Sequence, residues 1–342
     1  MWIVEQRRPI LHEKFLKKHN NVVDSVINYY RSRQPKVRYM YERMLLDCGA
    51  YTASRKGIEL DPERVKYIQE KIDPDKAIPL DYPFLPGMSI VVMKKRWRKT
   101  QENILDWQET TRLKEIVPVL HAWSPSSLIN NIKWMQKYAD CKYVAVGTIV
   151  TTSYVRYTGY FADREPNAIF IKMLSYAIWA IKKFSDFRVH LTGFGSSPLT
   201  LHLGFYLGID SLDTAGHRRK AAYGKIILPS IGERYVGDRN AKFGVTRLTD
   251  EEMEILRKCK CPVCRIDQSA LWRDWKARAI HNKYVMEREA EKASRLISEG
   301  LEVYERYLDD VFGRTSTKLR SLWRLAKVLA KNYKLEDFMV RV

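Results

Sequence analysis

The sequence predicts an α/β fold, a (β/α)8 TIM barrel, with an inserted or appended cysteine-rich subdomain. Between residues 44 and 213, six short apolar runs end in Asp, Gly or His, and polar segments with helical spacing lie between them. Buried strands that alternate with helices are typical of a parallel sheet. Six such units in so short a stretch favour a closed barrel over an open sheet. Three cysteines within six residues set the C-terminal part of the chain apart.

The predicted barrel elements follow one another along the chain. We predict strands in the apolar runs at residues 44–47, 77–81, 116–121, 143–147, 188–193 and 208–213. Helical patterns occupy residues 102–114, 126–138 and 167–184. The second of these helices has a capping residue at Ser124 and a proline, Pro125, in its first turn.

The two ends of the chain have less regular patterns. Residues 12–33 have mainly a helical pattern, and Val4 with its neighbours is a candidate strand. A charged helix is expected over about residues 282–307. The last thirty residues predict an amphipathic helix with a basic face, either solvated or in contact with a polyanion, and its apolar positions are Leu319, Leu322, Ala326 and Leu329.

Length and charge limit the architecture and the partner. The 342 residues, 45% of them apolar, suffice for one large domain or two ordinary ones, and we expect a barrel at 1–250 and a subdomain with basic helices at 251–342. The chain has 60 Lys and Arg against 40 Asp and Glu, a net charge of +20. Such a surplus favours a polyanion, above all a nucleic acid, with an acidic protein or membrane surface as the alternative.

The remaining composition favours a soluble, cytoplasmic protein. Two isolated cysteines, Cys48 and Cys141, do not resemble a disulfide framework, so a reducing compartment is expected. The N-terminal residues lack the apolar core of a signal peptide. The longest apolar stretch, residues 168–184, is interrupted by lysines, so no membrane span is expected. A homodimer is among the assemblies that the sequence leaves open.

The cysteine cluster predicts a metal site. Cys259, Cys261 and Cys264 form a Cys-X-Cys-X-X-Cys motif, and His281 follows on a predicted helix. Three thiolates and one imidazole complete a tetrahedral zinc shell without an open position, so we predict structural rather than catalytic Zn²⁺. Three unrelated cysteines and a surface histidine are the alternative, but Pro262 favours the tight turn that a zinc site needs.

Three carboxylates recur where predicted strands end. Asp47, Asp81 and Asp213 occupy this position, where aspartate is also a common helix cap. Three of them at one end of a predicted barrel favour a catalytic role over helix capping, because the active site of a barrel lies at the carboxyl ends of its strands. A carboxylate can attack the anomeric carbon of a sugar, and a second can transfer protons. The neighbouring glycines would allow a flat base to approach the backbone.

With these motifs, the chain resembles the tRNA-guanine transglycosylase superfamily over about residues 44–284. Residues 46–51, Leu-Asp-Cys-Gly-Ala-Tyr, are similar to its Asp-Ser-Gly-Gly-Phe-Gln motif. Residues 212–214 with Arg218, Arg219 and Gly224 look like its Phe-Asp-Cys-Val and Thr-Arg segment. The cysteine motif followed by Ala-Ile-His-Asn-Lys-Tyr-Val is the most specific match and is closest to the archaeal branch.

The resemblance implies a (β/α)8 barrel, a zinc ion that holds structure only, and a role for each matching residue. Asp213 matches the nucleophile that attacks C1′ of the target guanosine. Asp47 matches the carboxylate that contacts the base and helps its proton transfer, and Asp81 matches the one that reads the incoming 7-deazaguanine. The other positions that match substrate contacts, with a histidine in place of the family's glutamine, are His121, Gly147, Gly193, Gly195, Arg218 and Arg219.

The departures from the family pattern resemble the DNA-modifying branch, which places 7-cyano-7-deazaguanine into DNA. Cys48, Ala50 and Tyr51 replace the family's Ser, Gly and Phe. We therefore predict a pentosyltransferase that exchanges guanine in DNA for a 7-deazaguanine. The same exchange on tRNA is the first alternative. The others are a catalytically silent subunit and a zinc-stabilised nucleic-acid-binding protein without chemistry.

Overall fold

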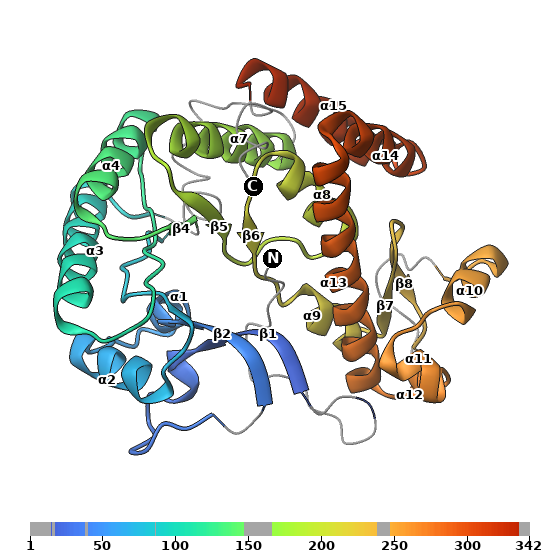
Figure 1. Ribbon diagram of the computed structural model, residues 1–342, viewed down its shortest axis with the longest axis horizontal. Coiled ribbons are helices and arrows are strands. Elements are labelled where there is room, and N and C mark those ends of the chain that lie inside the picture. The colour runs from blue at the N-terminus through green and yellow to red at the C-terminus, as the bar shows by residue number, and fades with distance from the viewer. Residues whose placement is uncertain are drawn as a thin grey trace.

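The structure, a computed structural model, describes residues 15, 18–37, 40–85, 87–146, 166–237 and 247–334. Figure 1 shows parallel strands surrounded by a ring of helices that includes α3, α4 and α7. The strands of the ring are β1 (Lys18–Ser25), β2 (Met40–Asp47), β3 (Lys76–Ala77), β4 (Tyr143–Val146), β5 (Arg188–Leu191) and β6 (Ser211–Leu212). The helices of the ring are α1 (Ala50–Arg55), α2 (Pro62–Ile72), α3 (Ile90–Thr110), α4 (Pro125–Tyr138), α7 (Pro166–Phe184), α8 (Pro198–Tyr206) and α9 (Gly216–Ala222).

The strands form two parallel sheets of three, β1-β2-β3 and β4-β5-β6. The predicted strand at residues 116–121 lies between them, because Ile116 forms a parallel bridge with Ala77, and Val119 forms one with Ala145. The amide of Leu120 donates to the carbonyl of Ala145 at 2.8 Å. All six predicted runs therefore contribute to one row of parallel backbone in sequence order, and the mixed α/β class with parallel sheets is confirmed.

Helices α2, α3, α4 and α8 of the ring begin at side-chain caps. Ser124 caps α4 and forms a capping box with Ser127, with Pro125 in the first turn, as the sequence predicts. Ser89 caps α3 through the amide of Val92, so this helix begins twelve residues before its predicted start at 102. The earlier turns of α3 were missed because exposed apolar and basic side chains there obscure the amphipathic pattern.

The prediction of a helix over residues 12–33 is wrong for the described residues. Lys18–Ser25 form strand β1, which pairs in parallel with β2, Val22 opposite Met44 and Val23 opposite Leu45. Only the short 3₁₀ helix η1 (Val26–Asn28) follows it. The pairing with β2 buries these β-branched side chains, and this tertiary contact overrides the local helical pattern. The candidate strand at Val4 lies outside the described residues.

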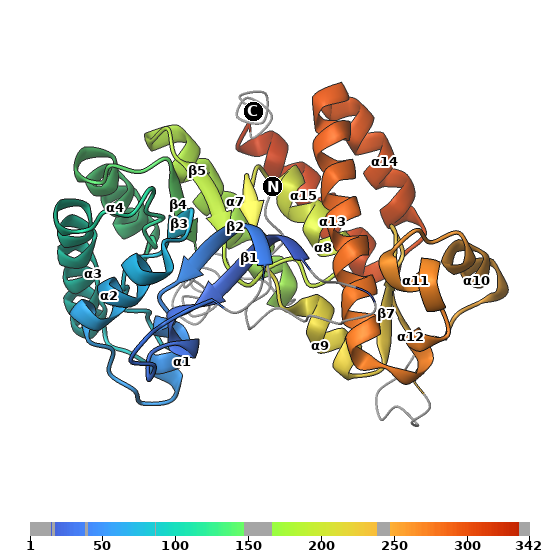
Figure 2. The ribbon, with the colours of Figure 1, turned by 60° about the horizontal axis from the view of Figure 1, so that its bottom comes forward.

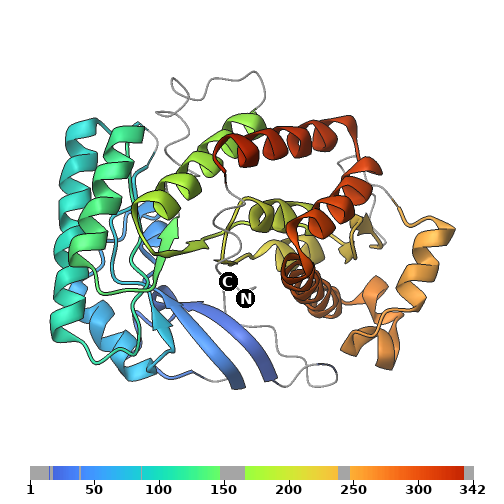
Figure 3. The same ribbon diagram turned by 45° about the horizontal axis from the view of Figure 1, so that its top comes forward.

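The described residues of the C-terminal part form a hairpin and six helices. These are β7 (Lys225–Leu228), antiparallel to β8 (Gly232–Tyr235), then α10 (Asp250–Arg257), α11 (Pro262–Asp267), α12 (Ala270–Arg273), α13 (Trp275–Glu299), α14 (Leu301–Gly313) and α15 (Thr317–Asn332). The charged helix expected over about 282–307 is in fact two helices, because Gly300 adopts a φ of 128° and ends α13. Figure 3 shows α13, α14 and α15 in succession, with α15 beside α7.

Three clusters of buried apolar side chains hold these parts together. One lies between α1, α2 and the first sheet, and a second joins the other sheet to α7, α8 and the C-terminal helices. The third joins Ile226 and Leu228 of β7 to Leu256 of α10 and Leu271 of α12. It combines residues from both sides of position 250, and the division at 250 stays a prediction. Within the described residues, no helix has the length and hydrophobicity to span a bilayer.

Candidate active site and metal centre

A cavity of about 790 Å³ lies where the parallel strands end. In Figure 2 the arrowheads of β1 and β2 mark the carboxyl ends of these strands, and α1 follows β2 at that end. Because the carboxyl ends of parallel strands meet at one edge, side chains from distant parts of the sequence converge there. The cavity is lined by most of the site residues that the sequence predicts, namely Asp47, Asp81, His121, Gly193, Asp213, Arg218 and Arg219.

Asp47 is the last residue of β2, and its Oδ2 accepts two hydrogen bonds. The Ser25 hydroxyl donates to its Oδ2 at 3.2 Å, and the amide of Gly49 donates to the same oxygen at 3.0 Å. Gly49 has a φ of 82°, and a Cβ there would lie 2.9 Å from the Ser25 hydroxyl oxygen, so the turn requires glycine. Burial, and next the charges of Asp81 and Asp213, raise the pKa of Asp47 to about 7.

Asp213 follows β6 and is almost fully buried, with 2% of its surface exposed. The amide of Gly193 donates to its Oδ1 at 2.7 Å, and His190 Nε2 lies 3.5 Å from the same oxygen. The other ring nitrogen of His190 is 2.9 Å from the Ser211 hydroxyl. One oxygen of Asp213 is therefore oriented by a backbone amide just after β5, and the imidazole of His190 on β5 lies close to the same oxygen.

Asp81 and His121 form a buried pair. His121 Nε2 lies 2.9 Å from Asp81 Oδ2, and the Cys48 thiol donates to Oδ1 at 3.1 Å. Burial raises the pKa of Cys48 well above its ordinary value, so the thiol remains a neutral donor. The rings of Phe84 and Trp97 lie 5.0 and 6.2 Å from the imidazole of His121. These contacts hold a hydrogen-bonding pair between aromatic walls.

Two predicted glycines are not among the cavity residues. Gly147 lies outside the described residues. Gly195 has a φ of 79°, and a Cβ there would lie 3.1 Å from the Leu212 side chain, so packing and backbone conformation account for this glycine. It does not line the cavity.

Several cavity residues were not predicted from the sequence. Ser25 lay in a segment with a helical pattern, and His190 lay inside a strand rather than at its end, where polar side chains were sought. Alternation along that strand was the available signal, since residues two apart point to the same side. Tyr51 and Thr52 of α1 also line the cavity, and so does Lys56, the residue that follows α1.

The rim of the cavity is positively charged. Arg219 and Lys56 are exposed, and Arg218 is half-buried. Both arginines belong to α9, which begins at Gly216, where a Cβ would lie 2.6 Å from the backbone of Ser196. The close approach of α9 to this loop brings the arginines to the mouth of the cavity. A cationic rim over a carboxylate floor suits a substrate with a phosphate backbone.

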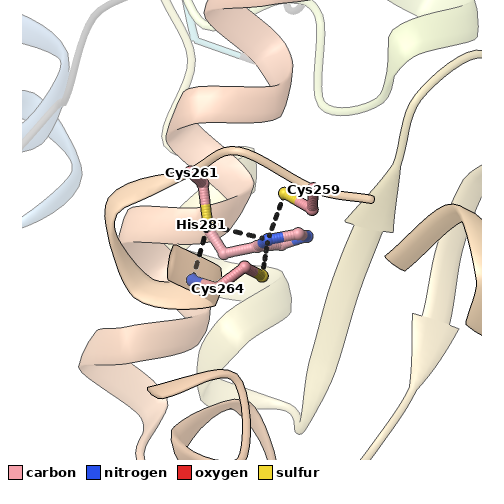
Figure 4. Close-up of side chains that lie close together, drawn as sticks. All are labelled: Cys259, Cys261, Cys264 and His281. Atoms are coloured by element: carbon pink, nitrogen blue, oxygen red, sulfur yellow. Dashed lines mark hydrogen bonds between the residues drawn. The ribbon is translucent and has the colours of Figure 1, made fainter. Parts of the chain in front are cut away.

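The predicted metal ligands lie together (Figure 4). His281 Nδ1 lies 3.7, 3.4 and 3.6 Å from the sulfur atoms of Cys259, Cys261 and Cys264, and all four ligand atoms lie within 4.8 Å of one another. Bonds of about 2.3 Å to sulfur and about 2.0 Å to nitrogen around a tetrahedral zinc place sulfur and nitrogen about 3.5 Å apart. The four side chains therefore fit a zinc ion.

Local structure orients these ligands. Cys261 is the N-cap of α11, and its sulfur accepts from the amide of Cys264 at 3.2 Å, with Pro262 in the first turn. His281 lies on α13 as predicted, and its Nε2 lies 3.0 Å from the carbonyl of Ile227. A proton on Nε2 leaves Nδ1 with the lone pair that a metal needs. The site would join α11, α13 and β7 into one unit.

Comparison with known proteins agrees with the geometry. A model of the family described as queuine tRNA-ribosyltransferase matches residues 43–312 of this chain. The matched region contains the cavity residues from Asp47 to Arg219 and all four candidate zinc ligands. No curated protein matches the chain.

Proposed function

The chain belongs to the queuine tRNA-ribosyltransferase family, and we propose that it exchanges guanine in a polynucleotide for a 7-deazaguanine such as 7-cyano-7-deazaguanine. One observation supports this most directly. Asp47, Asp81 and Asp213 come from three separate strand ends into one cavity, and the pKa of Asp47 there is raised to about 7. Carboxylates with different environments are suited to different tasks in one reaction.

The first half of the reaction uses Asp213 as the nucleophile. Its carboxylate oxygen bonds to C1′ of the target nucleotide while the bond from C1′ to guanine N9 breaks, and the electron pair of that bond goes to guanine. The amide of Gly193 and the ring of His190 orient the carboxylate through Oδ1. The product is a glycosyl ester on Asp213 together with a guanine anion that must take up a proton.

Asp47 supplies and recovers this proton. With a pKa raised to about 7, it is substantially protonated near neutral pH and can act as the general acid for departing guanine. The carboxylate left behind then accepts the N9 proton of the incoming 7-deazaguanine. N9 attacks C1′, the ester bond breaks, and Asp213 is restored. One glycosidic bond replaces another, so no redox cofactor or ATP is needed.

Asp81 and His121 are proposed to read the base. A carboxylate can accept hydrogen bonds from the N–H groups on the amidine-like edge of a guanine, and His121 at 2.9 Å keeps Asp81 in place. The aromatic walls at Phe84 and Trp97 fix the imidazole that orients this carboxylate. The predicted backbone contact of the base at Gly147, outside the described residues, is retained as part of this proposal.

We propose DNA as the polymer, with tRNA as the alternative. The net charge of +20, the exposed basic side chains of α15, and the changed residues Cys48, Ala50 and Tyr51 motivate DNA. The description of the matching family motivates tRNA. The target base must leave its stack in either polymer to reach the cavity, which costs a few kcal/mol.

The proposed scaffold is a closed (β/α)8 barrel that carries a zinc-stabilised subdomain. A zinc ion held by the three cysteines and His281 would fix the fold of the subdomain and take no part in the reaction, because its four protein ligands leave no open position. A cytoplasmic location remains part of the proposal, and a homodimer is one of the assemblies that it leaves open.

One experiment tests the function. The purified protein is incubated with radiolabelled 7-cyano-7-deazaguanine and either guanine-containing duplex DNA or tRNA, and the polymer is digested to nucleosides. Label in a deazaguanine nucleoside, with release of an equal amount of guanine, is the expected result. Binding of both polymers without any exchange would instead identify a silent binding subunit and refute the proposal.

A further inference from the structure

A second cavity of about 380 Å³ adjoins the catalytic cavity across helix α1. Ala50, Ala53 and Ser54 of α1 line the second cavity, whereas Tyr51 and Thr52 of the same helix line the first. Asp81, four residues after the end of β3, lines both cavities. The two cavities are therefore neighbours, and one extended ligand could occupy both.

Helix α3 supplies a cationic wall to this second cavity. Lys95 and Lys99 are exposed and lie one helical turn apart, and Arg96 is half-buried between them. The guanidinium of Arg96 donates to the carbonyl of Pro83 at 2.6 Å, and Pro83 lines the catalytic cavity. The Lys99 ammonium lies 5.2 Å from the ring centre of Tyr82. The basic wall is thus fixed to the loop that carries Asp81.

The rest of the lining is mostly apolar. Leu60 and Leu80 are buried, and Ile58 and Val92 expose 37% and 41% of their surface. Glu59 is an exposed carboxylate in the lining. Apolar walls with a cationic side suit a ligand that has a flat or saturated ring and an anionic group, and a nucleotide has both. Apart from Asp81, no residue of this second cavity has a role in the proposed base exchange.

A basic helix face is often merely solvated. Helix α3 has a second pair of basic residues that can serve as a control for Lys95 and Lys99. Lys94 and Arg98 are also exposed and one turn apart, but they do not line the cavity. Their charge equals that of Lys95 and Lys99. Any effect of overall charge on a polyanion would therefore be shared by both pairs, whereas a built subsite would depend on Lys95 and Lys99 alone.

We infer that the second cavity is a subsite for a nucleotide flanking the target guanine. Its sugar and base lie against the apolar lining, and its phosphodiester contacts Lys95 and Lys99. The inference rests on the proposed function, because it places the target nucleotide in the catalytic cavity. It goes beyond that function by assigning the path of the strand over α1 and α3, shown together in Figure 2.

The test compares two double variants of the full chain, Lys95→Gln with Lys99→Gln, and Lys94→Gln with Arg98→Gln. Glutamine is a good helix former, so both variants should retain α3, and circular dichroism checks this. Binding of fluorescent single-stranded DNA and RNA oligonucleotides with one central guanine is measured by anisotropy between 50 and 300 mM salt. The cavity variant should bind about tenfold more weakly at low salt. Each lost phosphate contact should also make its salt slope shallower by about 0.7.

The outcomes are distinct. Equal affinities and equal salt slopes for the two variants would overturn the subsite, even if the wild-type protein exchanges bases. Selective weakening in the cavity variant supports the subsite, and absence of base exchange by the wild-type protein would then refute the proposed function alone. No oligonucleotide binding by the wild-type protein would refute both. A stronger effect on DNA than on RNA, or the reverse, identifies the polymer that the subsite accepts.

Discussion

Asp47 has the environment that its proposed task requires. Its carboxylate lies in a cavity with two other aspartates, and like charges in a poorly solvated place disfavour the ionised form. The Ser25 hydroxyl and the Gly49 amide oppose this shift, which leaves the pKa at about 7 rather than far above it. A proton donor and acceptor works best when its pKa lies near the working pH.

The nucleophile is tested by Asp213→Asn. The amide keeps the shape of the side chain and can still accept from the Gly193 amide, but it lacks the anionic oxygen that attacks C1′. Base exchange should fall by at least about 10³-fold, as measured by incorporation of labelled deazaguanine. Oligonucleotide affinity and the melting temperature should change little. Asp250→Asn, at an exposed carboxylate on α10, is the matched control and should retain activity. Wild-type exchange by the Asp213 variant would exclude this residue as the nucleophile.

The raised pKa of Asp47 predicts a pH dependence of the rate. The protonated acid donates to departing guanine, so kcat/KM for the polynucleotide should decrease as the pH rises through about 7. In Asp47→Asn the residual rate should be low and should lack this decrease. Steady-state kinetics between pH 5.5 and 9 measure both profiles. The same inflection near pH 7 in the variant would assign it to another group.

The same pKa also predicts a pH dependence of stability. Between the ordinary value of 3.8 and about 7, the folded protein binds more protons at Asp47 than the unfolded chain does. The contribution of Asp47 to the free energy of unfolding therefore decreases as the pH rises through this window. The unfolding free energy of Asp47→Asn, measured relative to the wild type, should therefore increase from pH 4 to pH 8. The expected increase is on the order of 2 kcal/mol, since partial exposure of Asp47 reduces the full effect. Denaturant titrations of both proteins at pH 4 and pH 8 measure this. The same difference in unfolding free energy between variant and wild type at both pH values would contradict the raised pKa.

At the scale of elements, the four candidate zinc ligands lie where short helices pack against α13 and β7. Helices α10, α11 and α12 are short, and Figure 2 shows them at one side of the molecule beside β7 and α13. Short helices are marginal by themselves and depend on tertiary contacts. A metal held by Cys261 at the start of α11 and His281 on α13 would supply such a contact.

We expect one zinc ion per chain and loss of that ion in Cys261→Ala. The binding free energy of a structural zinc is part of the folding free energy, so the variant should lose several kcal/mol of stability in this part of the chain. Metal analysis and thermal unfolding measure the two effects. Cys141→Ala is the control, because this half-buried cysteine lies outside the cluster and its removal should leave the zinc in place. A metal-free wild-type protein prepared without chelator would contradict the zinc site.

At the scale of the whole molecule, the net charge of +20 attracts any polyanion. Attraction of this kind weakens with salt for DNA and RNA alike, so it does not distinguish them. Discrimination needs contacts to the 2′-hydroxyl or to the shape of the polymer. The chemistry of the cavity is equally compatible with ribose and deoxyribose at C1′. The choice of polymer therefore depends on surfaces outside the carboxylate cluster.

We predict that label from the deazaguanine enters guanine-containing DNA in preference to tRNA when both are present at matched salt and matched guanine concentration. The reason is the group of changed residues next to Asp47, including the exposed Tyr51 at the cavity. Liquid chromatography of the digested nucleosides separates ribonucleoside from deoxyribonucleoside products. Label in tRNA alone would reverse the choice of polymer and leave the proposed chemistry unchanged.

Much of this molecule could be predicted from the sequence alone, where the signal is local. Apolar runs that end in polar residues located Asp47 and Asp213 at strand ends, whereas Asp81 lies four residues after the end of β3. The spacing of three cysteines and one histidine located a four-ligand cluster, because short loops and one helix constrain those distances strongly. The resemblance to a known family was confirmed by the family model.

The features that depend on contacts between residues far apart in the sequence were determined only by the tertiary structure. Residues 18–25 have a helical pattern but form β1, because pairing with β2 buries Val22 and Val23. Gly195 shares the glycine pattern of Gly193 but packs against Leu212 rather than lining the cavity. The sequence placed three carboxylates at strand ends, but only their convergence in one poorly solvated cavity raises the pKa of Asp47 to about 7. Electrostatic coupling depends on distance in space and on exclusion of water, and a linear sequence contains neither.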